Sequence, residues 1–345
     1  MKRIILILTT TIFLLISSCK NENKIPMAET IAAAKEYHGK EISSEFDVKI
    51  NVLIAQMTIE EKIGMLHGNS MFATGGVERL GIPELKMVDG PLGIREEISK
   101  NSWASAGLDN DYATYYPAAG AVAATWDPEL SYTFGNSVGQ EARARGKDML
   151  LSPAINIVRT PLGGRTYEYF TEDPFLNKKL AVPFIVGVQK NDIMACVKHF
   201  AVNNQETNRG TVDVLVDERT LREIYLPAYK AAVTEANAYS LMGAYNKFRG
   251  DYLCENDLML NKILRDQWGF KGVVVSDWAA VHTTVKSLEN GLDIEMGTPK
   301  PFNEYFLADK LIKAAKTEEI SEEEINKHVK RILNVLFQVK AIEGK

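Results

Sequence analysis

The sequence predicts an α/β fold, a (β/α)8 TIM-type barrel whose first strands are irregular. Three observations lead to this prediction. Six short apolar runs alternate with helical patterns, and this order implies a parallel sheet with right-handed crossovers. The run Val273–Val275 is apolar without interruption, which is typical of a strand buried on both faces. A barrel of about 250 residues also fits within the 345 residues of the chain.

Local signals place the individual elements. Thr58 and Glu61 have the spacing of a capping box, and Asp127 and Asp173 are each followed by a first-turn proline, so all three sites predict helix starts. The expected helices are 58–67, 127–145, one from 174, 220–236, 257–268, 281–289, 302–316 and 321–339. The expected strands are 85–88, 149–151, 194–198, 240–245, one from 273, and 292–296. No internal repeat and no low-complexity linker indicates a second domain.

Composition excludes several classes of function. The chain is 46% hydrophobic, which is ample for a packed core, and its formal net charge of −5 comes without a stripe of Lys and Arg. A nucleic-acid partner is therefore not expected. No metal-ligand spacing such as CxxC or HExxH and no nucleotide-binding GxGxxG or GxxxxGK pattern occurs, so neither a metal nor a cofactor is expected. Cys196 and Cys254 are expected to be free thiols, with a bond between them as the lesser option.

The N-terminal residues predict export. Residues 1–18 combine a short positive start, an apolar core too short to span a membrane, and small residues before Cys19, which is typical of a lipoprotein signal peptide. Cys19 is expected to be acylated, so the protein would be lipid-anchored to a bacterial membrane on its periplasmic or cell-surface side. An ordinary signal peptide with a chance cysteine is the alternative. Residues 19–45 are polar and predict a tether, and the barrel is expected to occupy residues 46–345.

One carboxylate stands at the end of a predicted buried strand. Asp277 follows the apolar run from Val273, and Trp278 comes directly after it. Active sites of (β/α)8 barrels lie at the C-terminal ends of the strands, so an Asp placed there favours a catalytic role. The indole offers a flat apolar face on which a sugar ring can stack. The structural alternative is an Asp that caps the next helix.

Other polar residues also gather at predicted strand ends. Asp89 follows the first strand, Lys198 and His199 end the third, and Tyr245 ends the fourth. Each has a structural alternative: Asp89 begins a turn, the two basic residues pair with surface carboxylates, and Tyr245 packs in the core. With Asp277, four strand ends carry such residues, and this coincidence is hard to explain by the structural alternatives. Together the residues predict one polar site.

The ordered motifs resemble those of a known family. They are Asp89-Gly-Pro-Leu-Gly, Gly164-Arg165-Thr-Tyr-Glu168-Tyr-Phe170-Thr-Glu172-Asp173-Pro174, Lys198-His199-Phe-Ala, Met242-Gly-Ala-Tyr245-Asn246 and Val275-Ser-Asp277-Trp278. Together, from about residue 59 to 297, they resemble glycoside hydrolase family 3 and its β-glucosidase-like branch. The resemblance implies a retaining, exo-acting β-glycosidase that releases terminal non-reducing sugars from a β-linked oligosaccharide or glycoside.

The resemblance also implies roles for single residues. Asp277 matches the nucleophile that forms a covalent glycosyl-enzyme. Residues expected to bind the sugar or shape its pocket are Asp89, Arg165, Lys198, His199, Arg209, Tyr245 and Trp278. Among them, Arg209 and Tyr245 support the nucleophile, and Trp278 is a pocket wall. Glu168 and Glu172 are expected to hold Arg165 or neighbouring backbone.

The general acid is the departure from the family pattern. Retaining hydrolysis needs a second carboxyl group. In β-glucosidase-like members it is a Glu on a further α/β domain after the barrel, and that domain is expected to be absent because the sequence stops at Lys345. The β-N-acetylhexosaminidase branch uses a His-Asp pair after the third strand, but residues 200–217 contain no His.

Three explanations for the departure stay open. A second polypeptide supplies the acid, a local group such as Glu206 replaces it, or the chain is a non-catalytic glycan-binding barrel lipoprotein. In the first case, the isolated chain is expected to be impaired on ordinary glycosides.

Two functions outside the glycosidases have less support. The GxSxG pattern at residues 135–139 falls inside a predicted helix, where a serine hydrolase would need a strand-to-helix turn. A Schiff-base aldolase built on Lys198 is the other candidate.

Overall fold

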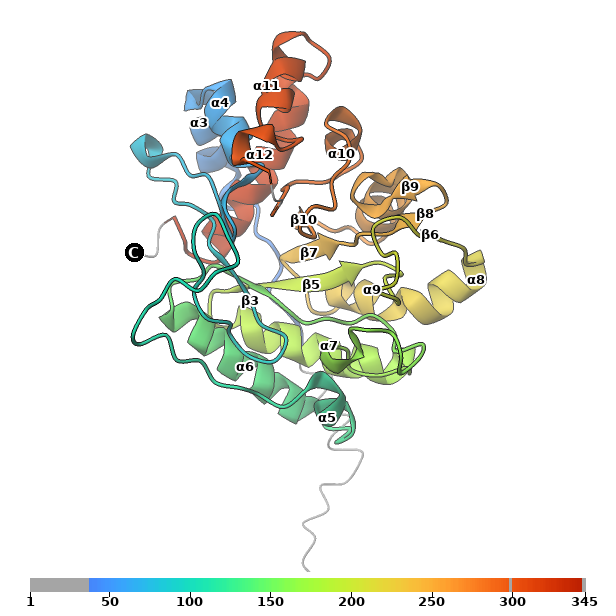
Figure 1. Ribbon diagram of the computed structural model, residues 1–345. Helices are drawn as coiled ribbons and strands as arrows, with labels where there is room; N and C mark the ends of the chain where they lie inside the picture. Colours follow the sequence, from blue (N-terminus) through green and yellow to red (C-terminus); the bar gives the residue numbers. More distant parts are fainter. Residues whose placement is uncertain (1–36, 298–299, 343–345) are drawn as a thin grey trace, which may run out of the picture. The chain divides into compact units, whose positions relative to one another are not determined.

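The computed structural model describes residues 37–297 and 300–342, which belong to one folded unit beginning at Tyr37 (Figure 1). The predicted signal peptide, Cys19 and the residues up to 36 lie outside the described ranges. No helix within those ranges is long and apolar enough to cross a membrane.

Five parallel strands form the central sheet. In spatial order they are β10 (Val273–Ser276), β7 (Ser240–Gly243), β5 (Met194–Phe200), β4 (Met149–Leu151) and β3 (Met87–Asp89). Each neighbouring pair is parallel, as predicted. All residues of β4, β5, β7 and β10 are buried. Burial on both faces explains why these strands are continuous apolar runs.

Shorter pairings continue the sheet from β10 back to β3. Ile294 pairs in parallel with Val275, and Glu295 pairs in parallel with His67. Strand β1 (Gly68–Ser70) then pairs antiparallel with β2 (Ala73–Thr74), and Ala73 pairs antiparallel with Lys86, just before β3. The sheet therefore closes into a barrel-like α/β fold with one antiparallel segment. The predicted irregularity lies in these first strands.

Helices surround the sheet. Figure 1 shows α6 (Pro128–Ala144) and α7 (Pro174–Gln189) on one side, and α12 (Glu322–Gln338) with α3 (Asp47–Gln56), α4 (Ile59–Gly64) and α11 (Asp309–Lys316) on the other. The three predicted caps are confirmed. Asp127 and Asp173 accept backbone N–H bonds before α6 and α7, and Thr58 forms the capping box with Glu61. These caps satisfy backbone donors that a helix leaves free at its start.

The predicted helix 220–236 is divided. It consists of α8 (Glu218–Thr220), a π-helical turn η3 (Leu221–Tyr225) and α9 (Pro227–Thr234). Pro227 has no N–H and its ring excludes the usual carbonyl four residues earlier, so the regular α pattern cannot pass through it. The predicted helix 257–268 is likewise a π-helical segment, η5 (Leu258–Gln267).

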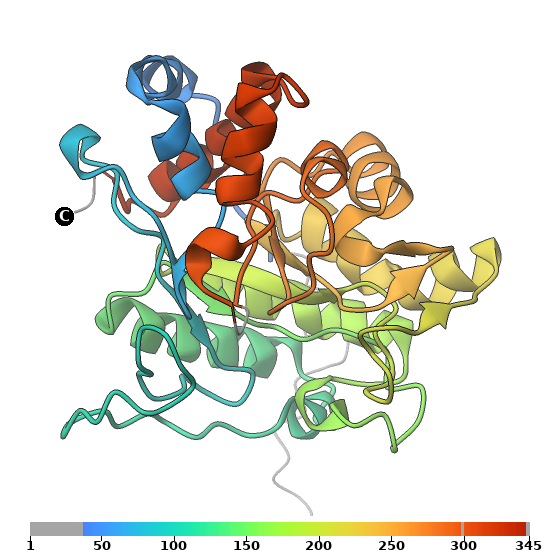
Figure 2. The same ribbon diagram turned by 45° about the horizontal axis from the view of Figure 1, so that its top comes forward.

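Other boundaries also shift. The helix expected from 281 begins later, as α10 (Val285–Glu289), and the expected helix 302–316 is divided into η6 (Phe302–Glu304) and α11. The remaining elements are η1 (Glu78–Leu80), α5 (Ala119–Ala123), η2 (Thr166–Glu168), η4 (Leu253–Glu255), and the strands β6 (Asp213–Val214), β8 (Lys247–Phe248) and β9 (Asp251–Tyr252). The last three form a small sheet beside α8 (Figure 2).

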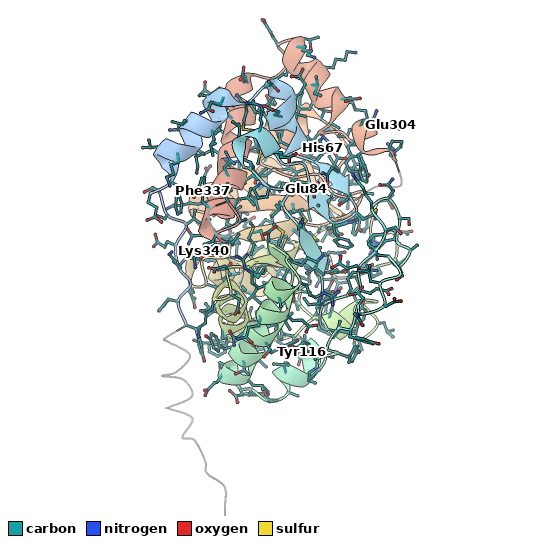
Figure 3. All side chains as sticks on the ribbon, turned by 90° about the vertical axis from the view of Figure 1, so that its left-hand side faces the viewer. His67, Glu84, Tyr116, Glu304, Phe337 and Lys340 are labelled. Carbon is teal, nitrogen blue, oxygen red and sulfur yellow. The ribbon has the colours of Figure 1, made fainter. Side chains whose placement is uncertain are left out.

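The predicted tether extends too far along the chain. Residues 37–45 pack on the barrel, because Ile42 is buried and Gly39 exchanges hydrogen bonds with Glu235 and Asn237. The boundary predicted between residues 45 and 46 is therefore corrected to before Tyr37. Helix α3, which follows, was also missed by the sequence pattern. Phe46 at its start stacks on Phe337, labelled in Figure 3, with ring centroids 5.0 Å apart.

A buried ionic cluster fixes β10 against α12. The Asp293 carboxylate accepts a hydrogen bond from Val274 N at 2.7 Å and contacts Arg265, His328 and Arg331 at 2.7 to 2.9 Å. Burial raises the pKa of Asp293, but the two arginines and His328 outweigh it and hold that pKa well below its usual range. The carboxylate therefore stays ionised and positions the strand that carries Asp277. Cys196 and Cys254 are free, as predicted.

Candidate active site

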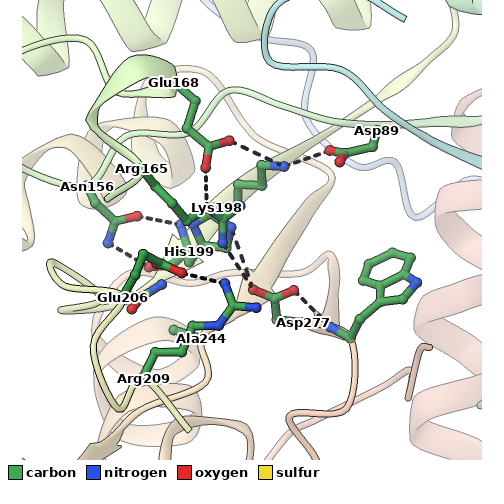
Figure 4. Close-up of polar contacts among 12 residues, drawn as sticks. Asp89, Asn156, Arg165, Glu168, Lys198, His199, Glu206, Arg209, Ala244 and Asp277 are labelled. Atoms are coloured by element: carbon green, nitrogen blue, oxygen red, sulfur yellow. Dashed lines mark hydrogen bonds and ion pairs between the residues drawn. The ribbon is translucent and has the colours of Figure 1, made fainter. Parts of the chain in front are cut away.

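The eight side chains predicted to do chemistry or bind sugar line one cavity. Its volume is about 380 Å³, and it lies at the C-terminal ends of the parallel strands. The cavity-lining residues among the predictions are Asp89, Arg165, Lys198, His199, Arg209, Tyr245, Asp277 and Trp278. Figure 4 shows most of them in contact with one another. The fold thus brings together residues from six separate segments of the chain.

Asp277 lies directly after β10 and is buried. Its Oδ1 accepts a hydrogen bond from Trp278 N at 2.8 Å. Its Oδ2 has no hydrogen-bond partner among the described residues, although Arg165 Nη1 lies 3.8 Å away and His199 Nε2 3.6 Å away. Burial raises the pKa of Asp277, and the opposing effects of Arg165, the Trp278 amide and Lys198 only partly offset it. One oxygen is therefore anchored and the other is open to a ligand.

The raised pKa of Asp277 predicts that the acid limb of the pH–rate profile is shifted to higher pH. Only the ionised carboxylate can attack carbon, so the rate of a reaction at Asp277 should fall as the pH drops through this pKa. Because the pKa is raised, the midpoint should lie above the ordinary aspartate value of about 3.9. The pH dependence of inactivation by an activated 2-deoxy-2-fluoro-β-glucoside measures it. Arg165→Met should move the limb to still higher pH, and a limb at or below the ordinary value would contradict the burial argument.

A chain of ion pairs crosses the polar side of the cavity. Lys198 Nζ lies 2.8 Å from Asp89 Oδ1 and 3.8 Å from Glu168 Oε2, and Arg165 Nε donates to the other oxygen of Glu168. Burial lowers the pKa of Lys198, but Asp89 and Glu168 outweigh burial and raise it. Burial raises the pKa of Asp89, and Lys198 and Arg165 reverse that effect and lower it. These groups therefore stay charged, and Glu168 holds Arg165 as predicted.

His199 is a neutral imidazole. It is completely buried, and burial together with Arg165, Lys198 and Arg209 holds its pKa well below the usual value. Neither ring nitrogen has a hydrogen-bond partner among the described residues. Unsatisfied buried nitrogens that line a cavity are costly unless a ligand pairs with them. His199 can therefore donate one hydrogen bond to a hydroxyl and accept another.

Arg209 and Tyr245 support the site beside the nucleophile. The Arg209 guanidinium lies 4.1 Å from the centroid of the Tyr245 ring and pairs with Glu206 at 2.5 Å. Burial and the neighbouring Asp277 carboxylate raise the pKa of Tyr245, so its hydroxyl stays protonated. Glu206 also packs against Gly164, where a Cβ would come within 2.7 Å of its Cγ. Gly164, with φ of 86°, therefore lets the segment 204–209 approach Arg165.

Comparison with known protein families shows which family this chain belongs to. The model of the glycosyl hydrolase family 3 N terminal domain matches residues 86–335. The chain belongs to glycosyl hydrolase family 3. Beta-glucosidase BoGH3A from Bacteroides ovatus is 45% identical over 301 residues, which cover 85% of this chain and 40% of that protein. Thermostable beta-glucosidase B from Acetivibrio thermocellus is 44% identical over 299 residues, which cover 86% of this chain and 38% of that protein.

Solved structures of family 3 members agree with the fold. The structure of beta-glucosidase 3B from Thermotoga neapolitana in complex with glucose superposes with a TM-score of 0.80 at 37% identity, over 86% of this chain and 43% of that one. The resemblance stated from the motifs is thus confirmed, as is the barrel-like α/β fold. The chain spans about two fifths of the length of the relatives it matches.

The family 3 motifs do not include every residue that lines this cavity. Phe72 and Trp103 also line it, as does Tyr167, which lies within the motif that begins at Gly164 but was not singled out from it. Phe72 lies 5.1 Å from Trp278 and 5.8 Å from Trp103 between ring centroids, so the three rings form an aromatic wall. Phe72 and Trp103 come from loops without periodicity, where no sequence signal pointed to them. Trp278 is fixed in this wall by the bond from its Nε1 to Met71 O.

Two further residues correct the expectations around Arg165. Asn156 was not singled out from the sequence, although it follows β4, and its side chain holds the backbone of His199. Glu172 was expected to hold Arg165 or nearby backbone. Its carboxylate instead accepts a hydrogen bond from the Thr171 hydroxyl. Glu168, from η2, is the carboxylate that contacts Arg165.

Proposed function

We propose that the chain binds the terminal non-reducing sugar of a β-linked glycoside and that Asp277 attacks its anomeric carbon. The attack forms a covalent glycosyl-enzyme, and water then releases the sugar with net retention. The observation that carries the proposal is the free Oδ2 of Asp277, which is buried in a cavity among cationic and hydroxyl donors. Relatives named β-glucosidases support a β-glucoside as the substrate.

The cavity suits an uncharged polyol. Arg165, Lys198 and Asp89 offer charged partners to sugar hydroxyls, and such hydrogen bonds are stronger than neutral ones. The aromatic wall offers an apolar face for the sugar or its leaving group. A cavity of about 380 Å³ accommodates a terminal sugar better than the middle of a chain, which supports exo action.

The reaction also needs a proton donor for the leaving oxygen, and the described cavity residues do not supply a suitable one. In retaining enzymes it lies about 5 to 5.5 Å from the nucleophile. Besides Asp277, the described carboxylates that line the cavity are Asp89 and Glu206. Asp89 is paired with Lys198 and its pKa is lowered, so it is a poor acid, while Glu206 is engaged by Arg209. We therefore propose that the acid belongs to a group outside the described residues, such as a second polypeptide.

Covalent labelling tests the nucleophile. Incubation with 2,4-dinitrophenyl 2-deoxy-2-fluoro-β-glucoside should add one fluoroglucosyl group, detected by intact mass, and peptide mapping should locate it on Asp277. The dinitrophenolate leaves without a proton, so the missing acid does not prevent this step. Binding of glucose without any labelling would favour the non-catalytic glycan-binding barrel.

We also propose that the protein is exported and anchored through a lipid on Cys19. The support is the sequence of residues 1–19 alone. Bacteria expressing the full chain and fed an alkyne palmitate should incorporate the label into the wild type and not into Cys19→Ala. Equal labelling of both proteins, or none of either, would refute the anchor.

A further inference from the structure

The chain after β4 continues alongside β5 toward the cavity. Lys198 N donates to Pro153 O at 3.0 Å, and Ile155 N donates to Lys198 O at 2.8 Å. These backbone bonds extend the pairing of β4 with β5 as far as Lys198. Backbone N–H and C=O groups need partners when they are buried, so the next residue of β5 also needs a donor and an acceptor.

Asn156 supplies both with its side chain. Its Oδ1 accepts from His199 N at 2.7 Å, and its Nδ2 donates to His199 O at 3.0 Å (Figure 4). A carboxamide has the same donor and acceptor pair as a peptide group, so the buried Asn156 side chain takes the place of the next backbone rung. The Tyr229 hydroxyl, from α9, donates to the same His199 oxygen at 2.8 Å. Three hydrogen bonds therefore fix the backbone of His199.

The His199 ring has no such anchor of its own. Both ring nitrogens of His199 lack hydrogen-bond partners among the described residues. The ring also makes an edge-to-face contact with the ring of Tyr169. The place of the imidazole in the cavity is thus set by packing and by where its backbone lies. Binding groups must be held to about 0.5 Å to work well. The backbone anchor is therefore a condition for sugar recognition by His199.

We infer that Asn156 is a positioning residue. By hydrogen-bonding the backbone N–H and C=O of His199, as a neighbouring strand would, it holds the His199 imidazole where it can bind a sugar hydroxyl. This inference rests on the proposed function. Asn156→Ala should lower the second-order rate constant for labelling of Asp277 by about tenfold or more, mainly through weaker binding of the fluoroglucoside. Tyr229→Phe removes one bond of three and should have a smaller effect of the same kind. It also tests the anchor should Asn156→Ala fail to fold.

Asn256 offers a matched control. It is buried, donates to Phe248 O at 2.8 Å and accepts from Met259 N at 3.0 Å, but it does not line the cavity. Asn256→Ala should lower the urea midpoint of unfolding as Asn156→Ala does, and leave the labelling constant within about twofold. An equal loss of labelling in both variants would reduce the role of Asn156 to general stability and overturn the inference.

A second readout does not depend on activity. The chain has five histidines, so comparison with His199→Gln identifies the imidazole signals of His199 in an NMR spectrum. These signals should move in Asn156→Ala and stay in place in Asn256→Ala. Unchanged His199 signals in Asn156→Ala would overturn the inference. A wild type that is never labelled would overturn the proposed function instead, and the NMR comparison would still decide the role of Asn156.

Discussion

Replacement of Asp277 by glycine is expected to abolish turnover of aryl β-glucosides, with a loss of at least about 10⁴-fold in kcat/KM. The reason is that the covalent path requires a carboxylate at this position, and the remaining cavity groups only bind and orient the sugar. The cavity should remain intact, since the short hydrogen bond of the Asp277 side chain is to the adjacent Trp278 amide, and its contacts with Arg165 and His199 are longer, at 3.8 Å and 3.6 Å. Initial rates with 2,4-dinitrophenyl β-glucoside measure the loss.

Added azide gives this prediction a sharper form. In Asp277→Gly a small anion fits the space left by the carboxylate and attacks the anomeric carbon from the same face. The product should be the α-glucosyl azide, identified by NMR, whereas the wild type should form none. Asp213, a carboxylate outside the cavity on β6, provides the control, because Asp213→Gly should keep the wild-type rate. Rescue that yields only the β-azide would contradict attack from the side of Asp277.

The second large effect concerns the leaving group. General acid assistance is typically worth about 10² to 10⁴-fold, so the isolated chain should turn over dinitrophenyl β-glucoside but be much slower on methyl β-glucoside, with a dependence on the leaving group about as steep as that of the uncatalysed reaction. Dinitrophenolate needs no proton, whereas methoxide does. Steady-state kcat/KM values for a series of aryl and alkyl glucosides measure the dependence. A flat series would show that the described cavity already contains an acid.

Glu206 is the control for this experiment. Its carboxylate lines the cavity but pairs with Arg209 at 2.5 Å. Glu206→Gln should therefore lower kcat/KM for the two substrates by similar factors, because it alters only the packing against Gly164 and the contact with Arg209. A selective loss on methyl β-glucoside, with dinitrophenyl β-glucoside unaffected, would assign the acid to Glu206 and remove the need for a second polypeptide.

The candidate site could be predicted because its key residues follow directly from buried strands. Asp277 comes after a run of valines, and Lys198 and His199 end another apolar run. Parallel strands share one carboxyl edge, so residues at these positions must converge whatever the loops do. The same reasoning explains why Lys198 contacts Asp89 although 109 residues separate them.

Other parts of the site had no local signal. Phe72 and Trp103 lie in loops, and Asn156 is an ordinary residue until its side chain meets His199, 43 residues away. Residues 37–45 looked like a tether because their composition is mostly polar, yet the side chains of Tyr37 and Ile42 and a few hydrogen bonds hold them on the barrel. The prediction of one continuous helix over residues 220–236 was wrong. Pro227 cannot continue the α-helical hydrogen bonds, and the chain before it forms a π-helical turn instead.

By itself the sequence determined the order of the strands and helices, the helix caps and the carboxylate at the end of β10. These features arise from interactions between residues a few positions apart, or from the burial of whole strands. Only the tertiary structure decided which side chains meet across the cavity: the aromatic wall, the free oxygen of Asp277 and the rung supplied by Asn156. Such contacts depend on how each loop leaves its strand, and that path is set by packing against segments far away in the chain.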